Sequence, residues 1–267
     1  MKKENKKVKI YIATHKAFTP PNIPEYVPIQ VGKARTELDF GYLTDYTGDN
    51  ISIKNNNYCE LTALYWIWKN DKESDIVGLC HYRRYFIKSH IQNIKNLIKQ
   101  NKVIKLLKNN EVILPKKKLW AGNVENCYIK CAGKNEDERR RAIDLQVLRD
   151  VFNKKDKTYL PALEEILASK YATYANMIIA RKNVINEYCE WLFSILFAME
   201  EEMIKRKIYF ENSRVFGFIS EILLGVWIRR NKLKVKYCSI LNTEFKTPSL
   251  LIKKVKHFWN NHIKKRG

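Results

Sequence analysis

The chain has 267 residues, of which 45% are hydrophobic, so it has enough apolar material to bury one large core. No stretch reaches the roughly 18 consecutive apolar residues that cross a membrane, and the N-terminus lacks the long apolar run of a secretory signal, so we expect a cytoplasmic protein. The formal net charge of +22 predicts attraction to polyanions such as nucleic acid, anionic lipids or phosphorylated substrates, without choosing among them.

The first predicted elements alternate between strands and a helix. Short β-branched and aromatic runs predict strands at residues 8–13 and 26–32. Leucine and aromatic residues at helical spacing predict a helix at residues 58–70, and the almost wholly apolar run at residues 75–82 predicts a buried strand. This order is typical of βαβ units, so we predict an α/β fold with a mainly parallel sheet flanked by helices.

The rest of the domain is predicted to be mostly helical. Lysines with apolar residues at helical intervals predict an amphipathic helix at residues 87–110, followed by a strand at residues 111–115. The remaining predicted elements are a strand at residues 174–180 and helices at residues 135–153, 184–205 and 216–228.

The C-terminal tail differs in composition from the rest of the chain. We predict one domain over residues 1–245 and a basic amphipathic tail over residues 246–267, where Phe258 and Trp259 lie among lysines and aliphatic residues. Such a helix can lie in the interface of an anionic membrane. The alternative is a last helix that docks on the domain and keeps its lysines in solvent.

The most informative motif lies at the end of the strand predicted at residues 75–82. There the apolar run is followed by His81, Tyr82, Arg83 and Arg84. Ligands of open α/β sheets bind beyond the carboxyl ends of strands, and guanidinium groups can bind phosphates through two hydrogen bonds. The motif therefore predicts a phosphate-binding site. The alternative is that the two arginines pair with surface carboxylates.

Two other loops contain candidate ligand-binding residues. His15 follows the first predicted strand and is in place to approach a nucleotide. Asp49 and Asn50 follow Gly48 in the polar loop predicted at residues 41–57, ahead of the first helix. These two residues either serve turn and helix-capping chemistry or contact a ribose, a base or a sugar hydroxyl, and the sequence does not separate the two possibilities.

Three carboxylates are candidates for a general base that deprotonates a hydroxyl group. Glu221 falls in an apolar helical run, where a carboxylate is either paired, for instance with Arg214, or held in a cleft with a raised pKa. The other two candidates are Asp45 and Asp49. We interpret Glu60, in the first turn of its helix, as a residue that interacts favourably with the helix dipole.

The sequence predicts no metal site. No Asp-x-Asp pair ends a predicted strand, and no second pair of cysteines or histidines accompanies Cys127 and Cys131. We expect no required cofactor, with dependence on a divalent metal left open.

Several segments resemble a known family. They are KIYIATHK at 9–16, PIQVG at 28–32, TGDNIS at 47–52, NYCELTALYWIWKN at 57–70, GLCHYRRYF at 78–86, YANMIIARKNVINEYCEWLFSILF at 174–197 and RVFGFISEILLGVW at 214–227. Together they resemble domain-of-unknown-function family 4422, which is found in bacterial capsular and exopolysaccharide gene clusters and is described as glycosyltransferase.

The resemblance implies a GT-A-like, Rossmann-like fold, a UDP-sugar donor whose sugar is galactose (pyranose or furanose), and a polyprenyl-diphosphate-linked oligosaccharide acceptor. The acceptor side falls on the later block, at Asn176 and Arg214. In the family an acidic residue precedes Arg-Leu-Leu, whereas Glu221 precedes Ile222, so Arg214 is left to replace that arginine. The implied donor-binding residues are Thr14, His15, Val31, Gly32, Asp49, Asn50, His81, Tyr82, Arg83 and Arg84.

The leading hypothesis is a hexosyltransferase of capsule, exopolysaccharide or O-antigen synthesis. It would act at the inner face of the cell membrane, held there peripherally by the basic tail. An acceptor hydroxyl would displace UDP while Arg83 and Arg84 stabilise the leaving diphosphate, with Glu221 and Asp49 as the other catalytic candidates.

One alternative is a basic nucleic-acid-binding protein, although no such motif is present and we expect no nucleic-acid partner. Another is a non-catalytic scaffold of a polysaccharide assembly complex; the oligomeric state is left open.

Overall fold

The structure, a computed structural model, describes residues 6–120, 122–130, 138–210 and 213–244. The tail predicted at residues 246–267 lies outside the described residues. The strands are β1 (Val8–Thr14), β2 (Tyr26–Gln30), β3 (Leu43–Thr44), β4 (Ile76–His81), β5 (Arg84–Ile87), β6 (Val112–Pro115), β7 (Lys118–Leu119), β8 (Tyr171–Ala172), β9 (Ile178–Arg181) and β10 (Val235–Asn242). The α-helices are α1 (Asn55–Tyr58), α2 (Leu61–Asn70), α3 (Gln100–Leu106), α4 (Val124–Lys130), α5 (Glu138–Lys155), α6 (Leu160–Ala168), α7 (Lys182–Lys205) and α8 (Val215–Arg230).

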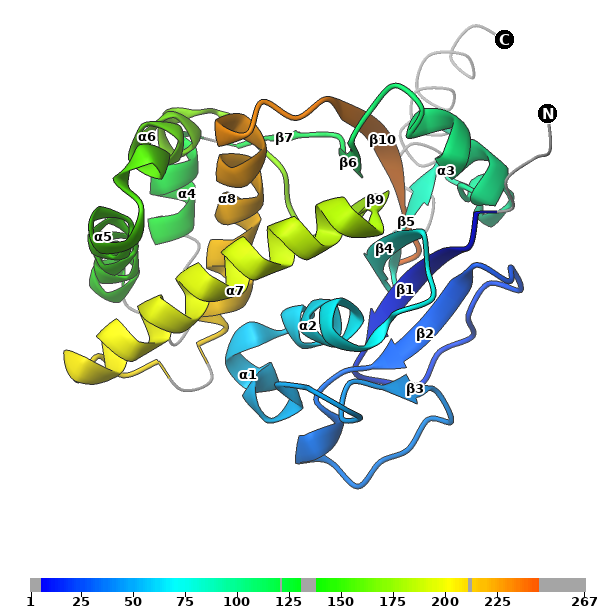
Figure 1. The fold of residues 1–267 in the computed structure, drawn as a ribbon, viewed down its shortest axis with the longest axis horizontal. Helices are drawn as coiled ribbons and strands as arrows, with labels where there is room; N and C mark the ends of the chain where they lie inside the picture. The colour runs from blue at the N-terminus through cyan, green and yellow to red at the C-terminus, as the bar shows by residue number, and fades with distance from the viewer. Residues whose placement is uncertain (1–5, 121, 131–137, 211–212, 245–267) are drawn as a thin grey trace, which may run out of the picture.

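Strands β1, β2 and β4 form a parallel part of an eight-stranded sheet. β1 lies between the other two, with Ile10 opposite both Tyr26 of β2 and Gly78 of β4. Helix α2 precedes β4 and buries Leu61 in the same apolar cluster as Tyr11 of β1. The βαβ arrangement predicted from the sequence is therefore confirmed, and helices flank the sheet (Figure 1).

The sheet as a whole is mixed, so the prediction of a mainly parallel sheet is wrong. A turn at Tyr82 and Arg83 reverses the chain after β4, and β5 pairs with β4 in the antiparallel direction. β9 runs antiparallel to β4 and β6, and β10 runs antiparallel to β5. Four of the eight pairings in this sheet are parallel and four are antiparallel. An apolar run predicts a buried strand, but it does not specify the direction of its neighbours.

The helix predicted at residues 87–110 is wrong for most of its length. Ile87 ends β5, a 3-10 turn follows at Ile94–Asn96, and only α3 is α-helical. Ile87 is buried and pairs with Ser239 of β10, so a strand much later in the chain overrides the local helical pattern. The sequence prediction also missed β10, α4 and α6.

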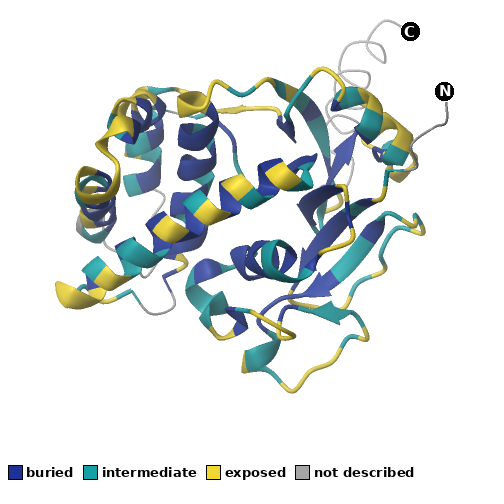
Figure 2. Cartoon of the chain, viewed as in Figure 1, coloured by how far each residue is buried: buried dark blue, intermediate teal, exposed yellow. Residues whose placement is uncertain are grey.

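Buried apolar residues cover both faces of the sheet. On β1, Tyr11 and Ala13 belong to one cluster and Ile10 and Ile12 to another, because successive side chains of a strand point to opposite faces. The larger cluster joins the sheet to α2 and to α5 through α8, and α7 crosses this helical layer (Figure 1). Figure 2 shows most of α8 as buried, whereas α7 has a buried and an exposed side.

Within the described part of the chain, no helix combines the length and the apolar character needed to span a membrane.

The centre of β4 requires a residue without a side chain. A Cβ atom on Gly78 would lie 2.7 Å from Cγ1 of Ile179 and 3.2 Å from the carbonyl oxygen of Ile178, both on β9. Because Ile179 is fully buried, we expect Gly78→Ala to reduce the free energy of unfolding by about 1–3 kcal/mol, measured by denaturant titration. Gly122→Ala, where the nearest atom would be 3.9 Å away, should change it by less than about 0.5 kcal/mol. Equal losses in the two variants would contradict this account.

Candidate active site

A cavity of about 340 Å³ opens beyond the carboxyl ends of β1 and β4. These strands are parallel and adjacent, with Ala13 opposite His81, so their ends reach the same edge of the sheet. The volume is within the range of small-molecule sites. The lining residues are Ala13, Thr14, His15, Val31, Asn55, Asn56, Cys59, Glu60, His81, Tyr82, Arg83, Arg84, Ala175, Arg214 and Glu221.

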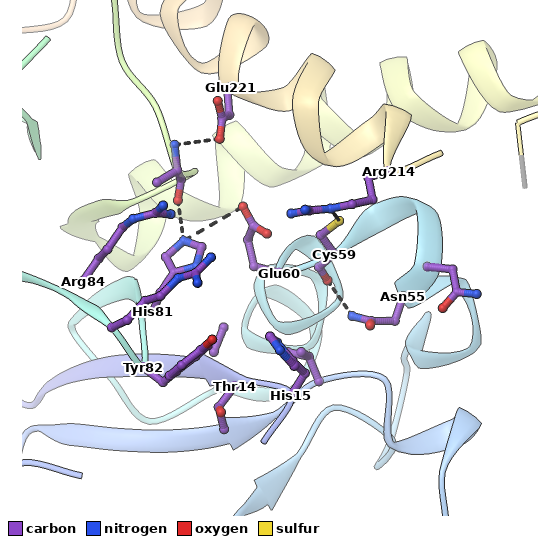
Figure 3. Close-up of a pocket in the computed structure, with 15 residues that line it drawn as sticks. Thr14, His15, Asn55, Cys59, Glu60, His81, Tyr82, Arg84, Arg214 and Glu221 are labelled. Atoms are coloured by element: carbon purple, nitrogen blue, oxygen red, sulfur yellow. Dashed lines mark hydrogen bonds and ion pairs between the residues drawn. The ribbon is translucent and has the colours of Figure 1, made fainter. Parts of the chain in front are cut away.

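The cavity contains most of the site residues predicted from the sequence. Figure 3 shows Thr14 and His15 at one end, Glu221 at the other, and Arg84 and Arg214 on opposite sides between them. Val31 and the HYRR motif, residues 81–84, line it as well. Gly32, Asp45, Asp49, Asn50 and Asn176 are not among the lining residues.

The loop before α1 that contains Asp45, Asp49 and Asn50 is held in place by hydrogen bonds. The side chain of Asn50 donates a hydrogen bond to the carbonyl of Gly48 (2.8 Å), and Asp49 accepts one from the Tyr65 hydroxyl (3.1 Å). Asp45 is fully buried and accepts a hydrogen bond from the Gly32 N–H (2.8 Å). These contacts match the turn chemistry considered as the alternative for Asn50, and they hold the loop beside the cavity rather than in it.

Backbone strain is concentrated at the cavity. Among the described residues, six non-glycine residues have positive φ, and three of them line the cavity: Cys59 (52°), Ala175 (68°) and Arg214 (56°). Asn176, with φ of 46°, follows Ala175 directly. Each such conformation costs about 1–3 kcal/mol and persists only where the surroundings impose it, as is common at functional sites.

Two glutamates face this cavity. Glu60 immediately precedes α2, and its Oε1 accepts a hydrogen bond from Asn176 Nδ2 (2.8 Å) and lies 3.9 Å from His81 Nε2. Glu221 on α8 accepts a hydrogen bond from the N–H of Ala175 at Oε1 (2.8 Å). Glu60 was interpreted from the sequence as a helix-dipole residue; its place in the cavity depends on Asn176, which lies far away in the chain.

Burial controls the charge state of Glu221. Its pKa is raised from 4.5 to about 7, first by burial and then by the negative charge of Glu60. The N–H of Ala175 and the charges of Arg84 and Arg214 act in the opposite direction. Glu221 therefore exchanges its proton near neutral pH, which is the property of a general acid or base.

His81 is held in one tautomer. Its Nε2 lies 2.5 Å from the carbonyl oxygen of Ala175, which can only accept, so Nε2 carries the hydrogen. Burial lowers the pKa of His81, Arg84 and Arg83 lower it further, and Glu60 opposes the shift. Burial also lowers the pKa of His15, so the cationic character of the cavity comes mainly from arginines.

The two arginines of the HYRR motif differ in their partners. Nη1 of Arg83 donates to both carboxylate oxygens of Glu244, at 2.9 and 3.0 Å, as the alternative interpretation of this motif proposed. Within the described residues, the side chain of Arg84 makes no hydrogen bond and no ion pair. Arg214 donates from Nε to the Cys59 sulfur (3.3 Å) and leaves the rest of its guanidinium for a ligand. Arg84 and Arg214 are thus the cations available to an anion.

Tyr82 forms an aromatic surface at the β1 end of the cavity. Its ring packs edge-on against His15, with centroids 5.4 Å apart, and Lys16 Nζ lies 4.9 Å from the ring centre.

No group of three or more His, Cys, Asp or Glu side chains in the described ranges is arranged to hold a metal ion.

The fold and the cavity define an α/β protein with a cationic, carboxylate-containing ligand site beyond the ends of its parallel strands. The chain is similar to a solved structure titled as the apo form of WbbM, a bifunctional glycosyltransferase, with a TM-score of 0.76 and 31% identity. The match covers 89% of this chain and 45% of that one, so the chain spans less than half of that protein. No match was found among curated proteins.

The model of the family described as "Domain of unknown function (DUF4422)" matches residues 9–232. The chain belongs to this family, and the resemblance found in the sequence is confirmed.

The raised pKa of Glu221 predicts a pH-dependent loss of stability. The folded state binds a proton on Glu221 more tightly than the unfolded state, so stability falls as pH rises from about 4.5 to about 7. Glu221→Gln removes this loss and keeps an oxygen for the Ala175 N–H. We expect the variant to gain up to about 3 kcal/mol over the wild type at pH 8 and almost nothing near pH 4.5, measured by denaturant titration. A difference that is the same at both pH values would contradict the assignment.

Proposed function

We propose that this chain is a glycosyltransferase that moves a sugar from a nucleotide-sugar donor to a hydroxyl group of an acceptor glycan. One observation carries the proposal: a single cavity holds Arg84, a cation with no protein partner among the described residues, together with Glu221, a carboxylate that titrates near pH 7. The similarity to a glycosyltransferase at 31% identity over 89% of the chain supports the same reaction class.

The donor orientation follows from the charges in the cavity. The diphosphate would lie between Arg84 and Arg214, which stabilise the negative charge that develops on the leaving group. The nucleoside would then lie toward His15 and Tyr82, and the sugar toward Glu221 (Figure 3).

The chemical step uses Glu221 as the general base. The acceptor oxygen forms a bond to the anomeric carbon, the bond from that carbon to the β-phosphate oxygen breaks with its electron pair, and the hydroxyl proton passes to Glu221. Burial raises the pKa of Glu221, and the charge of Glu60, the second carboxylate of the site, raises it further and so increases the basicity of Glu221.

The finer parts of the proposal follow the family resemblance. They are a GT-A-like fold, UDP-galactose as donor, a polyprenyl-diphosphate-linked oligosaccharide as acceptor, and a role in capsule, exopolysaccharide or O-antigen assembly at the inner face of the membrane without a required metal. The net charge of +22 is consistent with an anionic membrane surface and a diphosphate-bearing acceptor.

Nucleotide binding provides the direct test of the donor site. We expect UDP and UDP-galactose to bind in isothermal titration calorimetry in the presence of EDTA. Arg84→Ala should weaken binding roughly 10- to 100-fold, because a hydrogen-bonded cation is removed from the diphosphate. Arg83→Ala is the matched control and should weaken it less than about threefold, since Arg83 is paired with Glu244.

The proposal would be contradicted if no UDP-sugar bound to the chain. Binding only with added manganese would contradict the metal-free account of the arginines. RNA binding in place of UDP binding would favour the nucleic-acid alternative.

Catalysis should depend on Glu221. We expect Glu221→Gln to lower the rate of sugar transfer roughly 10²- to 10⁴-fold while UDP affinity changes little, because the variant loses the base but not the cations. The wild-type rate should rise with pH through about 7, as Glu221 loses its proton. Radiolabelled transfer to lipid-linked oligosaccharide measures both effects. A wild-type pH profile that is flat between pH 6 and 8 would exclude Glu221 as the base.

A further inference from the structure

Glu221 lies at the meeting point of three hollows in the molecule. Besides the donor cavity, it lines a groove of about 840 Å³ and a smaller apolar pocket of about 220 Å³. The groove is more than twice the volume of the donor cavity, and Glu221 is the residue that lines both. A ligand in the groove therefore reaches the residue at the sugar end of the donor cavity.

One face of α8 leads from Glu221 along the groove. Glu221, Gly225, Ile228 and Arg229 all line it, at the i, i+4, i+7 and i+8 positions that share one side of a helix. A Cβ atom on Gly225 would lie 3.4 Å from Cδ1 of Ile166 on α6. This is an ordinary van der Waals distance, and the glycine leaves this part of the groove wall without a side chain.

The walls of the groove combine aromatic rings with polar groups. Tyr171 of β8 is 52% exposed, and Tyr237 of β10 faces Lys117, whose Nζ lies 5.8 Å from the ring centre. In the described part of the chain, Lys117 and Lys232 make no side-chain hydrogen bond or ion pair. Rings that offer an apolar face and an edge hydroxyl, beside unpaired hydrogen-bond donors, suit a ligand with apolar C–H faces and many hydroxyls.

We propose that this groove binds the acceptor as an oligosaccharide, with the reacting sugar at Glu221 and the preceding sugars along α8 toward Tyr171, Tyr237 and Lys232. The assignment rests on the proposed glycosyl transfer. A groove of this volume selects for a chain of several sugars over a monosaccharide, because each further unit contacts another part of the wall. The unpaired lysines favour chains that carry phosphate or carboxylate groups.

The test combines a glycan array with enzyme kinetics. The chain of 267 residues, fluorescently labelled and saturated with UDP, is applied to an array of bacterial oligosaccharides, and the best-bound series is then assayed as acceptors of one to four sugars. We expect the wild-type KM to fall as the acceptor lengthens. Tyr171→Ala should raise the KM for the longest acceptor roughly 10-fold, whereas Tyr171→Phe should keep it near the wild-type value, because the ring face is retained.

Two measurements keep this test separate from that of the donor site. UDP affinity and the slow hydrolysis of UDP-sugar by water should be the same in Tyr171→Ala and in the wild type, since Tyr171 lies outside the donor cavity. Tyr46→Ala, which alters a tyrosine of similar exposure (58%) outside the groove, should leave the acceptor KM unchanged.

The outcomes separate as follows. A chain that binds no UDP contradicts the proposed function itself. A chain that binds and hydrolyses UDP-sugar but binds no glycan, or whose acceptor KM is the same in Tyr171→Ala, overturns the groove assignment alone.

Discussion

The candidate active site depends on two consecutive residues with left-handed backbone, Ala175 and Asn176. The Ala175 N–H donates to Glu221 and its carbonyl accepts from His81, while the Asn176 amide donates to Glu60. Asn176 also bonds to α8, through the Gly217 carbonyl and the Ser220 hydroxyl. Helix α8, strand β4 and the start of α2 are thereby held to one short segment, which explains why its strained conformation is maintained. Asn176, predicted as an acceptor-binding residue, is buried in the structure and positions Glu60.

The cavity brings together two carboxylates, Glu60 and Glu221, and two available arginines, Arg84 and Arg214. Burial is the main cause of the raised pKa of Glu221, and the like charge of Glu60 raises this pKa further. Arg84 and Arg214 offset this effect and, without a ligand, Arg84 has no counter-ion within bonding distance among the described residues. A diphosphate would supply the missing negative charge beside the arginines. In the proposed reaction, the same charges would account for donor binding and for the basicity of Glu221.

Local patterns located much of this site. His15 and the HYRR motif follow apolar strands, and the end of a strand is visible in the sequence; Glu221 stands out because a carboxylate is unusual in an apolar helix. Asp49 and Asn50 do not line the cavity, and the sequence left their role open because a Gly-Asp-Asn loop has the same composition whether it binds a ligand or forms a turn. Glu60 was missed because a carboxylate in the first turn of a helix has an ordinary explanation.

The sequence by itself determined the parallel unit of β1, α2 and β4, the helices α5, α7 and α8, and the strand ends that line the cavity. These features depend on periodicity and on residues adjacent in the chain. Only the tertiary structure decided the antiparallel part of the sheet and the presence of Glu60 and Glu221 in one cavity. It also decided that Arg83 is paired with a carboxylate while Arg84, within the described residues, is not. Each of these depends on a partner supplied from far along the chain, by β9 and β10, by Asn176 and by Glu244. Such partners are selected by the packing of the whole domain, which no local pattern encodes.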